Sequence, residues 1–281
     1  MPELPELEVT KDRLRLALAG RRITGASLRH PALMRTVEPP LEALHESHIR
    51  SVSRLGKFLD IATDNGLHLC VHLMLNGRLI VVPAAKPATR DSLLVLGLDD
   101  ATDLRIEESG TRRRVQAHLT RDPKTIAWIA EAGLDPLGPA FTVNRFRSGL
   151  GRRNRTVKRF LTDQRAIAGI GNAYSDETLF EARLSPFKNT GELKPEEAIR
   201  LFMAVKKVLH DAILHLKTLD HLPTRRDRTF LRVHDRLGQP CPVCGSEVRR
   251  VSYVESTTFY CPGCQTGGKV LADRRLSRLL R

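Results

Sequence analysis

The sequence predicts an α+β fold in which an N-terminal helix and an antiparallel β-rich region precede a helical region and a small metal-binding module. Three observations predict it. Apolar side chains recur at helical spacing over residues 3–19. Short β-rich segments separated by turn residues fill residues 21–120, and helical patterns occupy residues 142–216. Strands and helices that are segregated along a chain in this way are typical of α+β proteins.

The first helix is predicted over residues 3–19 and ends at Gly20. Prolines at positions 2 and 5 suit its first turn. A helix that is apolar on two sides is expected to be buried between layers. One face carries four leucines and another carries two more apolar side chains, namely Leu4, Leu7, Leu14 and Leu18, and Val9 and Leu16.

The β-rich region consists of segments bounded by turn signals such as Asp64-Asn65-Gly66 and Asp99-Asp100. This pattern predicts an antiparallel sandwich or a barrel, with a loop over residues 83–90. Cys70 lies within an apolar segment and is predicted to be a buried core residue. The clearest segments are Phe58–Ile61, Leu67–Leu73, Arg78–Val82, Leu93–Leu98 and Arg114–Leu119.

The helical region follows a predicted linker at Asp135-Pro136-Leu137-Gly138-Pro139. Its longest helix opens on Pro195-Glu196-Glu197, a favourable first turn. Beyond the last cysteine, residues 265–281 alternate leucines with arginines, which fits a docked amphipathic helix or a solvated basic tail equally well. The helices are predicted at 142–149, 154–163, 174–182 and 195–216.

The chain of 281 residues carries 46 Lys and Arg against 32 Asp and Glu, a net charge of +14. This surplus favours a polyanionic partner, most simply nucleic acid, over a generally basic protein, because the cations cluster. Each cluster is interpreted as a set of phosphate contacts, with a solvated basic face as the alternative. The clusters are Arg145, Arg147, Arg152, Arg153, Arg155, Lys158 and Arg159, and Arg225, Arg226, Arg228, Arg232 and Arg236.

Four of the five cysteines form a C-x2-C-x16-C-x2-C pattern. This spacing predicts one structural Zn²⁺ site with four thiolate ligands and no open position for catalysis. Disulfides or free thiols are the alternatives, and a reducing compartment disfavours disulfides. The predicted ligands are Cys241, Cys244, Cys261 and Cys264.

The N-terminus reads Met1-Pro2-Glu3-Leu4-Pro5-Glu6. Removal of Met1 is expected, and it exposes the secondary amine of Pro2, which is partly neutral near pH 7 and able to attack a sugar or carbonyl carbon. Glu3 stands beside it as a candidate proton shuttle. The alternative interpretation is that the prolines only pre-set the helix.

Residues Gly169-Ile170-Gly171-Asn172 are predicted to form a turn between two helices. Glycines there let backbone amides approach an anion, and Asn172 adds a side-chain hydrogen bond to a phosphate. A dinucleotide-binding fold does not fit, because no strand precedes the turn. No apolar run approaches membrane-spanning length, and the charged start does not fit a signal peptide, so we expect a soluble, cytoplasmic, nucleoid-associated protein without a membrane partner.

From residue 2 to about residue 265, the chain resembles the formamidopyrimidine-DNA glycosylase / endonuclease VIII family of base-excision repair enzymes. Four segments in order carry the resemblance. They are Pro2–Glu6, Arg54–Phe58, the helix-two-turns-helix segment Asp163–Glu177, and the four cysteines followed by Gln265.

The resemblance implies a helix plus an antiparallel β-sandwich, then a helix-two-turns-helix domain and a zinc finger. We expect a catalytic domain over 1–130, a DNA-binding domain over 131–236, a zinc finger over 237–265 and a basic tail over 266–281. The implied partner is double-stranded DNA with oxidised or abasic sites, bound by a monomer.

The implied activity is that of a bifunctional DNA glycosylase and AP lyase. Pro2 attacks C1′ of the damaged nucleotide and forms an iminium, Glu3 handles protons, and β,δ-elimination cuts the strand. Glu6 is a supporting carboxylate, and Lys57 contacts phosphate near the lesion. The further DNA-binding residues are Leu75, Arg113, Arg153, Lys158, Gly171 and Asn172.

The chain departs from the family's pattern at four places. Leu75 stands where a methionine usually wedges into the duplex, and Thr111–Val115 lacks the usual aromatic residue. Ser256 replaces a phosphate-binding arginine, with Arg249 or Arg250 as a substitute. The loop over residues 218–230 is short. Ser256 and the altered wedge leave a non-catalytic binder of damaged DNA as the alternative, although Pro2, Glu3 and Lys57 favour the enzyme.

Overall fold

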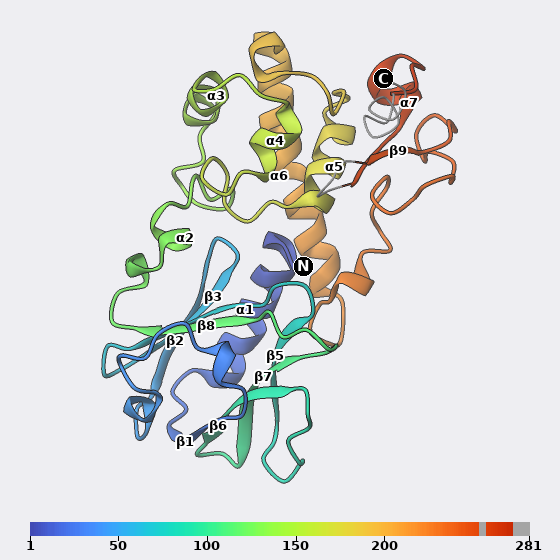
Figure 1. Cartoon of the computed structure of the whole chain (residues 1–281). Coiled ribbons are helices and arrows are strands. Elements are labelled where there is room, and N and C mark those ends of the chain that lie inside the picture. Colours follow the sequence, from blue (N-terminus) through green and yellow to red (C-terminus); the bar gives the residue numbers. More distant parts are fainter. Residues whose placement is uncertain (253–256, 272–281) are drawn as a thin grey trace, which may run out of the picture. The chain divides into compact units, whose positions relative to one another are not determined.

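The computed structural model describes residues 1–252 and 257–271 and is shown in Figure 1. The chain divides into two compact units. Residues 1–131 and 215–225 form the first unit, and residues 132–214 together with the chain from residue 226 form the second. Ser256 and the tail beyond residue 271 lie outside the described residues.

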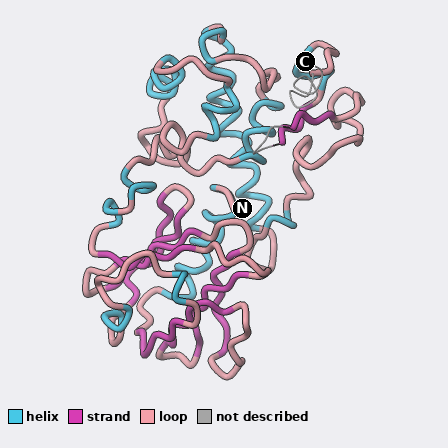
Figure 2. The backbone as a smooth tube through the Cα atoms, viewed as in Figure 1, coloured by secondary structure: helices cyan, strands magenta, loops and turns pink. Residues whose placement is uncertain are grey.

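The first unit contains helix α1 (Leu4–Leu18) and two separate four-stranded antiparallel sheets, coloured as strands in Figure 2. One sheet has the order β1-β6-β7-β5, and the other has the order β2-β3-β4-β8. The strands are β1 (Ile23–Leu28), β2 (Ile49–Leu55), β3 (Phe58–Thr63), β4 (His68–His72), β5 (Gly77–Pro83), β6 (Ser92–Leu98), β7 (Thr102–Glu108) and β8 (Gln116–Thr120).

Both sheets contribute to one apolar core, so the predicted α+β fold with an antiparallel sandwich is confirmed and the barrel is not formed. Residues of β3 alternate between the two faces of their sheet. Leu59 and Ile61 enter the core between the sheets, whereas Phe58 packs on the opposite face with Cys70 and Ile126. Cys70 is fully buried, as predicted, but it lies in this smaller outer cluster.

Helix α1 buries its leucine face against this core. Leu4, Leu14 and Leu18 are each at most 2% exposed, and Val9 on the other face is buried as well. The prediction of a second fully buried face is wrong at Leu16, which is 83% exposed. The helix is therefore covered on both sides only in its first turns.

The second unit is mainly helical. It contains α3 (Val143–Gly151), α4 (Val157–Thr162), α5 (Asn172–Glu181) and most of α6 (Pro195–Lys217). A two-stranded hairpin of β9 (Arg249–Ser252) and β10 (Thr257–Tyr260) precedes the short helix α7 (Pro262–Thr266). Aromatic rings pack its helices together, with Phe146 edge-on to Phe160 at 5.4 Å and Phe141 stacked on Phe202 at 5.0 Å between ring centroids.

The helix predicted from residue 154 begins at Val157, because the side chain of Thr156 caps it by accepting the Arg159 N–H. The short helix α2 (Ala127–Ala130) was not predicted. Isolated 3-10 turns complete the described structure, at Pro31–Leu33, Leu41–Leu44, Pro123–Thr125, Thr190–Glu192 and Arg225–Asp227. Among the helices of the described ranges, we find none with both the length and the hydropathy that crossing a membrane requires.

Candidate active site and DNA-binding residues

The start of helix α1 holds the predicted catalytic carboxylate in a fixed position. Glu3 is the N-cap residue, and its backbone N–H donates to Oε2 of Glu6 over 2.8 Å in a capping box. Glu3 is 3% exposed, and Glu6 is fully buried. Because Pro2 is bonded directly to this capped residue, its position is constrained on one side by the helix.

The turn that carries Lys57 is tied to the same helix. Arg54 Nε donates to Oε2 of Glu8 over 2.8 Å, and Arg54 Nη1 donates to the carbonyl oxygen of Gly56 over 3.1 Å. Burial opposes the ionisation of Glu8, but hydrogen bonds from Lys11 and Arg54 outweigh it and hold the pKa of Glu8 below its usual value. A charged, partly buried pair therefore joins α1 to the β2–β3 turn.

His72 belongs to the same neighbourhood and was not predicted as a site residue. Its pKa is lowered to about 4 by burial first, then by the positive charges of Lys57 and of the N-terminal amine, which in the described chain belongs to Met1. The Met74 N–H donates to His72 Nδ1 over 3.2 Å, so the neutral ring carries its proton on Nε2. Phe58, the residue after Lys57, pairs with His72 between β3 and β4, and their ring centroids lie 4.9 Å apart, so His72 lies beside the turn that carries Lys57.

The other predicted contacts of the first unit lie on loops. Leu75 follows strand β4 and is 49% exposed, which suits a side chain that inserts into DNA. Arg113 is held within its own unit, because its Nη2 donates to Asp91 Oδ1 over 3.1 Å and to the Arg90 carbonyl oxygen over 3.0 Å. The assignment of Leu75 and Arg113 to DNA binding stays a prediction.

In the second unit, Gly171 is the N-cap of α5 and Asn172 is its first residue. The preceding Gly169 has φ 91°, a conformation that favours glycine. Asn172 Nδ2 donates to the Thr257 carbonyl oxygen of strand β10 over 2.7 Å. Its Oδ1 is buried and has no hydrogen-bond partner among the described residues. The predicted phosphate ligand is thus attached to the β9–β10 hairpin.

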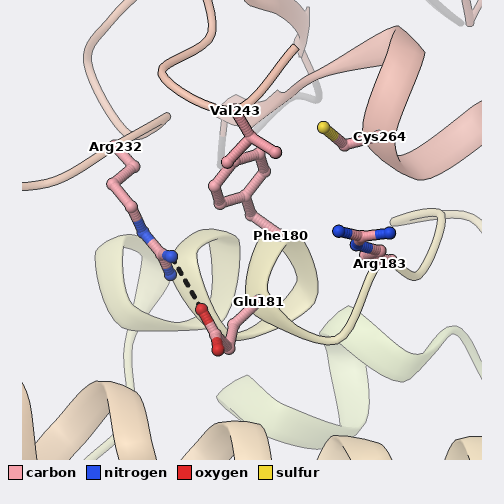
Figure 3. A pocket seen from close by; sticks show the side chains of 6 residues that line it. All are labelled: Phe180, Glu181, Arg183, Arg232, Val243 and Cys264. Atoms are coloured by element: carbon pink, nitrogen blue, oxygen red, sulfur yellow. Dashed lines mark hydrogen bonds and ion pairs between the residues drawn. The ribbon is translucent and has the colours of Figure 1, made fainter.

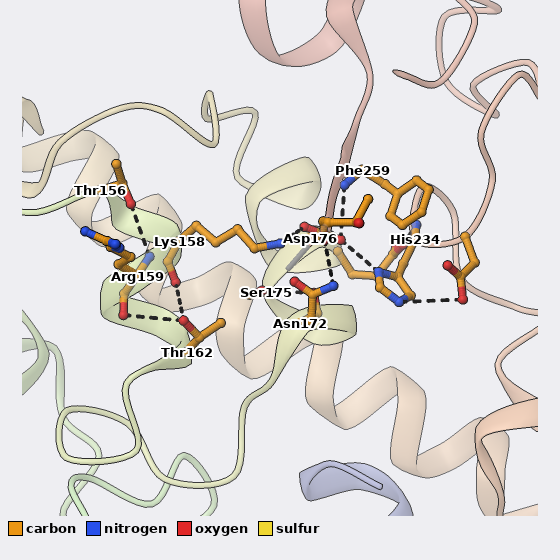
Figure 4. Close-up of polar contacts among 12 residues, drawn as sticks. Thr156, Lys158, Arg159, Thr162, Asn172, Ser175, Asp176, His234 and Phe259 are labelled. Carbon is orange, nitrogen blue, oxygen red and sulfur yellow. Dashed lines mark hydrogen bonds and ion pairs between the residues drawn. The ribbon is translucent and has the colours of Figure 1, made fainter. Parts of the chain in front are cut away.

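Lys158 is 8% exposed and forms an ion pair with Asp176, which is fully buried (Figure 4). Asp176 Oδ2 also accepts hydrogen bonds from His234 Nδ1 over 2.8 Å and from the Phe259 N–H over 3.2 Å. Lys158 therefore braces α4, α5 and the hairpin in this structure. Its predicted role in DNA binding requires it to leave Asp176 and stays untested.

The basic clusters divide into surface and structural cations. Arg145, Arg147, Arg152, Arg153 and Arg159 are exposed. Arg155 instead pairs with Asp163 over 2.5 Å and lies over the Phe160 ring. In the second cluster, Arg232 pairs with Glu181 over 2.7 Å. Arg153 thus remains a candidate phosphate contact, whereas other members of its cluster hold the fold together.

The four predicted metal ligands converge. Their sulfur atoms lie within 4.8 Å of one another, with Cys244 Sγ and Cys261 Sγ 3.4 Å apart and Cys241 Sγ and Cys264 Sγ 3.8 Å apart. None of the described cysteines is in a disulfide. Four convergent thiols fit a structural metal ion, and zinc in particular suits such ligands.

Gln265 anchors this cluster to the helical core. Its Oε1 accepts the Cys261 N–H over 2.8 Å, and its Nε2 donates to the Leu184 carbonyl oxygen over 2.9 Å. Cys264 and Arg232 are among the residues that line a small pocket, shown in Figure 3, and the Arg232 guanidinium lies 4.9 Å from the centre of the Phe180 ring. Neither Asn172 nor Gly171 lines this pocket.

Comparison with known proteins agrees with this arrangement. Residues 1–116 match the model of the formamidopyrimidine-DNA glycosylase N-terminal domain, and residues 132–221 match that of the formamidopyrimidine-DNA glycosylase H2TH domain. The chain is 35% identical to the formamidopyrimidine-DNA glycosylase of Herpetosiphon aurantiacus and 37% identical to that of Thermus thermophilus. These alignments cover 94% and 95% of the chain and the whole length of each relative.

Solved structures give the same result. The crystal structure of the MutM (Fpg) protein from Thermus thermophilus superposes with a TM-score of 0.82 at 33% identity, covering 96% of this chain and 100% of that one. A complex of Lactococcus lactis Fpg with DNA containing an oxidized pyrimidine superposes with a TM-score of 0.86 at 25% identity, covering 94% and 100%.

The sandwich with its N-terminal helix, the H2TH helices and the four-cysteine finger define a DNA glycosylase of base-excision repair. Within that class, the chain belongs to the formamidopyrimidine-DNA glycosylase family.

Proposed function

We propose that this glycosylase is bifunctional, removing oxidised bases from double-stranded DNA through a Schiff base of Pro2 and then cleaving the strand by β,δ-elimination. The observation that carries the proposal is the arrangement at the N-terminus. Pro2 precedes the capped and buried Glu3, and the Arg54–Glu8 ion pair joins the turn that carries Lys57 to the same helix.

The first step is an attack by the amine. Once Met1 is removed, the lone pair of the Pro2 nitrogen forms a bond to C1′, and the departing base takes the electron pair of the glycosidic bond together with a proton. The bond from C1′ to the ring oxygen then breaks, and Glu3 supplies the proton that this oxygen takes up. The product is an iminium joining Pro2 to the open sugar.

Elimination follows from this iminium, because it acidifies the proton on C2′. Loss of that proton expels the 3′ phosphate, and loss of a further sugar proton expels the 5′ phosphate. Water then hydrolyses the iminium and regenerates the amine. Lys57 supports these steps by holding a phosphate beside the lesion, and its cation offsets the charge of the departing group.

Base release requires the damaged nucleotide to leave the helix, at a cost of a few kcal/mol that damage lowers. We assign Leu75 to the space that opens, since it is an exposed apolar side chain on a loop of the first unit. Arg113, Arg153, Lys158, Gly171 and Asn172 remain the proposed contacts to the DNA.

The metal ion that we propose for the four cysteines is Zn²⁺. Its ligands come from the turn at Cys241 and Cys244 and from the start of α7 at Cys261 and Cys264. A bound ion supplies folding free energy to a module too small to fold by burial alone. It thereby positions the β9–β10 hairpin against Asn172.

Borohydride trapping tests the proposal. The protein is mixed with a duplex that contains one abasic site, and the reducing agent converts any iminium into a stable amine. We expect a covalent protein–DNA adduct whose attachment site is the N-terminal proline by mass spectrometry. A protein that binds the duplex but yields no adduct is a non-catalytic binder, and that result refutes the proposal.

A further inference from the structure

Trp128 is the only tryptophan of the chain, and the functional assignments above do not use it. It lies on α2 in the first unit and is 55% exposed. Its ring meets His72 at 5.4 Å and Phe58 at 6.1 Å between centroids, with interplanar angles of 71° and 64°. These edge-to-face contacts hold one side of the indole against the outer face of the β3–β4 sheet.

The support beneath this indole is rigid. Ile126 is 7% exposed and packs with Phe58 and Cys70, and Ile129 packs on the same cluster. The N–H groups of Ile129 and Ala130 both donate to the Ile126 carbonyl oxygen over 2.9 Å. Trp128 therefore projects from a short helix that is anchored through the isoleucines on either side of it, Ile126 and Ile129.

An exposed indole at such a place is able to bind a ligand. Its apolar surface is large, and its N–H is a hydrogen-bond donor on a half-exposed side chain. Within the described residues, its histidine neighbour is the group whose pKa responds to Lys57 and to the N-terminal amine. Lys57, the proposed phosphate contact, directly precedes Phe58, whose ring meets that of Trp128, so a DNA strand held at Lys57 lies close to the indole.

The net charge of +14 favours a nucleic acid as the partner of this chain, and Lys57, one residue from Phe58, places a cation near the indole. Nucleobases stack on exposed aromatic rings whatever their identity, and phosphate oxygens accept indole N–H groups. We propose that Trp128 is a DNA contact, with its indole packed against a base or sugar of the strand that Pro2 attacks. This inference rests on the proposed function.

Because the chain has one tryptophan, its fluorescence reports on this position alone. The probe is a duplex with a tetrahydrofuran abasic analogue, which the enzyme binds without cleaving. We expect the emission to change along the same binding curve that anisotropy of labelled DNA gives. At saturation, we expect the DNA to shield the indole from quenching by acrylamide.

Substitutions at Trp128 distinguish a contact with DNA from a purely structural role of the indole. We expect Trp128→Ala to weaken binding of this duplex about tenfold, with Trp128→Phe in between, since the smaller ring retains part of the stacking surface. Leu16→Ala is the matched control, because Leu16 is an equally apolar and 83% exposed side chain on α1, and it should leave affinity unchanged. Thermal unfolding checks that each variant is folded.

Wild-type affinity in a folded Trp128→Ala variant, or an indole as accessible to acrylamide with DNA as without it, overturns the inference. Borohydride trapping keeps this outcome apart from failure of the proposed function. Trapping by the wild-type protein with no effect of Trp128→Ala on binding refutes the tryptophan contact alone. Absence of trapping in the wild-type protein refutes the Pro2 chemistry, whatever the indole does.

Discussion

The carboxylate of Glu6 accepts the backbone N–H of Glu3 over 2.8 Å, and both residues are buried. This hydrogen bond places the residue that follows Pro2 at a defined point of the first helical turn. We therefore expect Glu6 to be a positioning residue for the candidate nucleophile, acting through the backbone of Glu3.

Glu6→Ala removes this acceptor and leaves the Glu3 N–H buried without its partner. We expect the free energy of unfolding to fall by about 1–2 kcal/mol, the usual range for a lost helix cap. We also expect slower borohydride trapping, because the amine is held less firmly. Urea unfolding and a trapping time course measure the two effects. Glu42→Ala, at an exposed glutamate of the same unit, should change neither.

Substitutions at the first two residues of the processed chain separate the two chemical steps. Pro2→Gly replaces the secondary amine by a primary one, so we expect trapping on abasic DNA to weaken. Glu3→Gln removes the proton donor, so we expect base release to be lost while some lyase activity on abasic DNA remains. Gel assays of both reactions measure this, and normal base excision by Glu3→Gln contradicts the role assigned to Glu3.

The features that could be predicted from the sequence depend on residues that lie close together along the chain. Pro2 and Glu3 are neighbours in the chain, and their catalytic roles stay predictions. The cysteine spacing alone predicts a four-thiol cluster, which the structure shows. The β-rich segment predicted at Phe58–Ile61 likewise lies within strand β3, and its Leu59 and Ile61 enter the core. Such local patterns survive folding, because the helix and strand periods determine which side chains share a face.

The contacts that the sequence did not predict join residues that lie far apart along the chain. His72 meets Phe58 because β3 and β4 pair in antiparallel register, and Trp128 reaches both through the packing of α2. The sequence places Lys158 in a basic run, where a surface position is expected. In the structure Lys158 is buried in an ion pair with Asp176, eighteen residues later. The spacing of residues along the sequence does not predict such contacts, because they arise from tertiary packing.

The pKa of His72 gives a testable pH dependence. Its folded value of about 4 lies below the value near 6.5 of an unfolded chain, so the unfolded state binds more protons between these two values. Stability is therefore unaffected by this group above about pH 6.5 and falls as the pH drops towards 4, by at most about 3 kcal/mol.

His72→Gln should flatten this part of the profile. Urea unfolding at pH steps from about 7 to 4 measures it for both proteins. His210→Gln is the control, because His210 lies on α6 with 70% of its side chain exposed. An equally steep loss of stability in His72→Gln contradicts the assignment of this pH dependence to His72.

Removal of the metal should affect the finger selectively. We expect elemental analysis to find a single zinc ion per chain, and chelation to unfold residues 241–264 and to lower DNA affinity. The first unit should stay folded, because its core contains none of these residues. Hydrogen exchange locates the loss of structure. Undiminished DNA binding by the zinc-free protein argues against the finger as a DNA contact.

The buried pair of Lys158 and Asp176 yields a prediction that separates a structural from a DNA-binding lysine. Lys158→Met leaves Asp176 buried without its cation, so we expect a loss of about 3–5 kcal/mol in the free energy of unfolding. Adding Asp176→Asn to Lys158→Met should recover part of this loss, because the uncompensated charge is then gone.

The salt dependence of DNA binding completes the test. If Lys158 only braces the fold, the double variant should keep the wild-type slope of affinity against salt concentration. If it contacts phosphate, the slope should fall by about one unit. Arg153→Met is the comparison, since Arg153 is an exposed cation of the same cluster and is expected to lower the slope with little change in stability. Equal slopes for Arg153→Met and the wild-type protein would remove Arg153 from the proposed phosphate contacts.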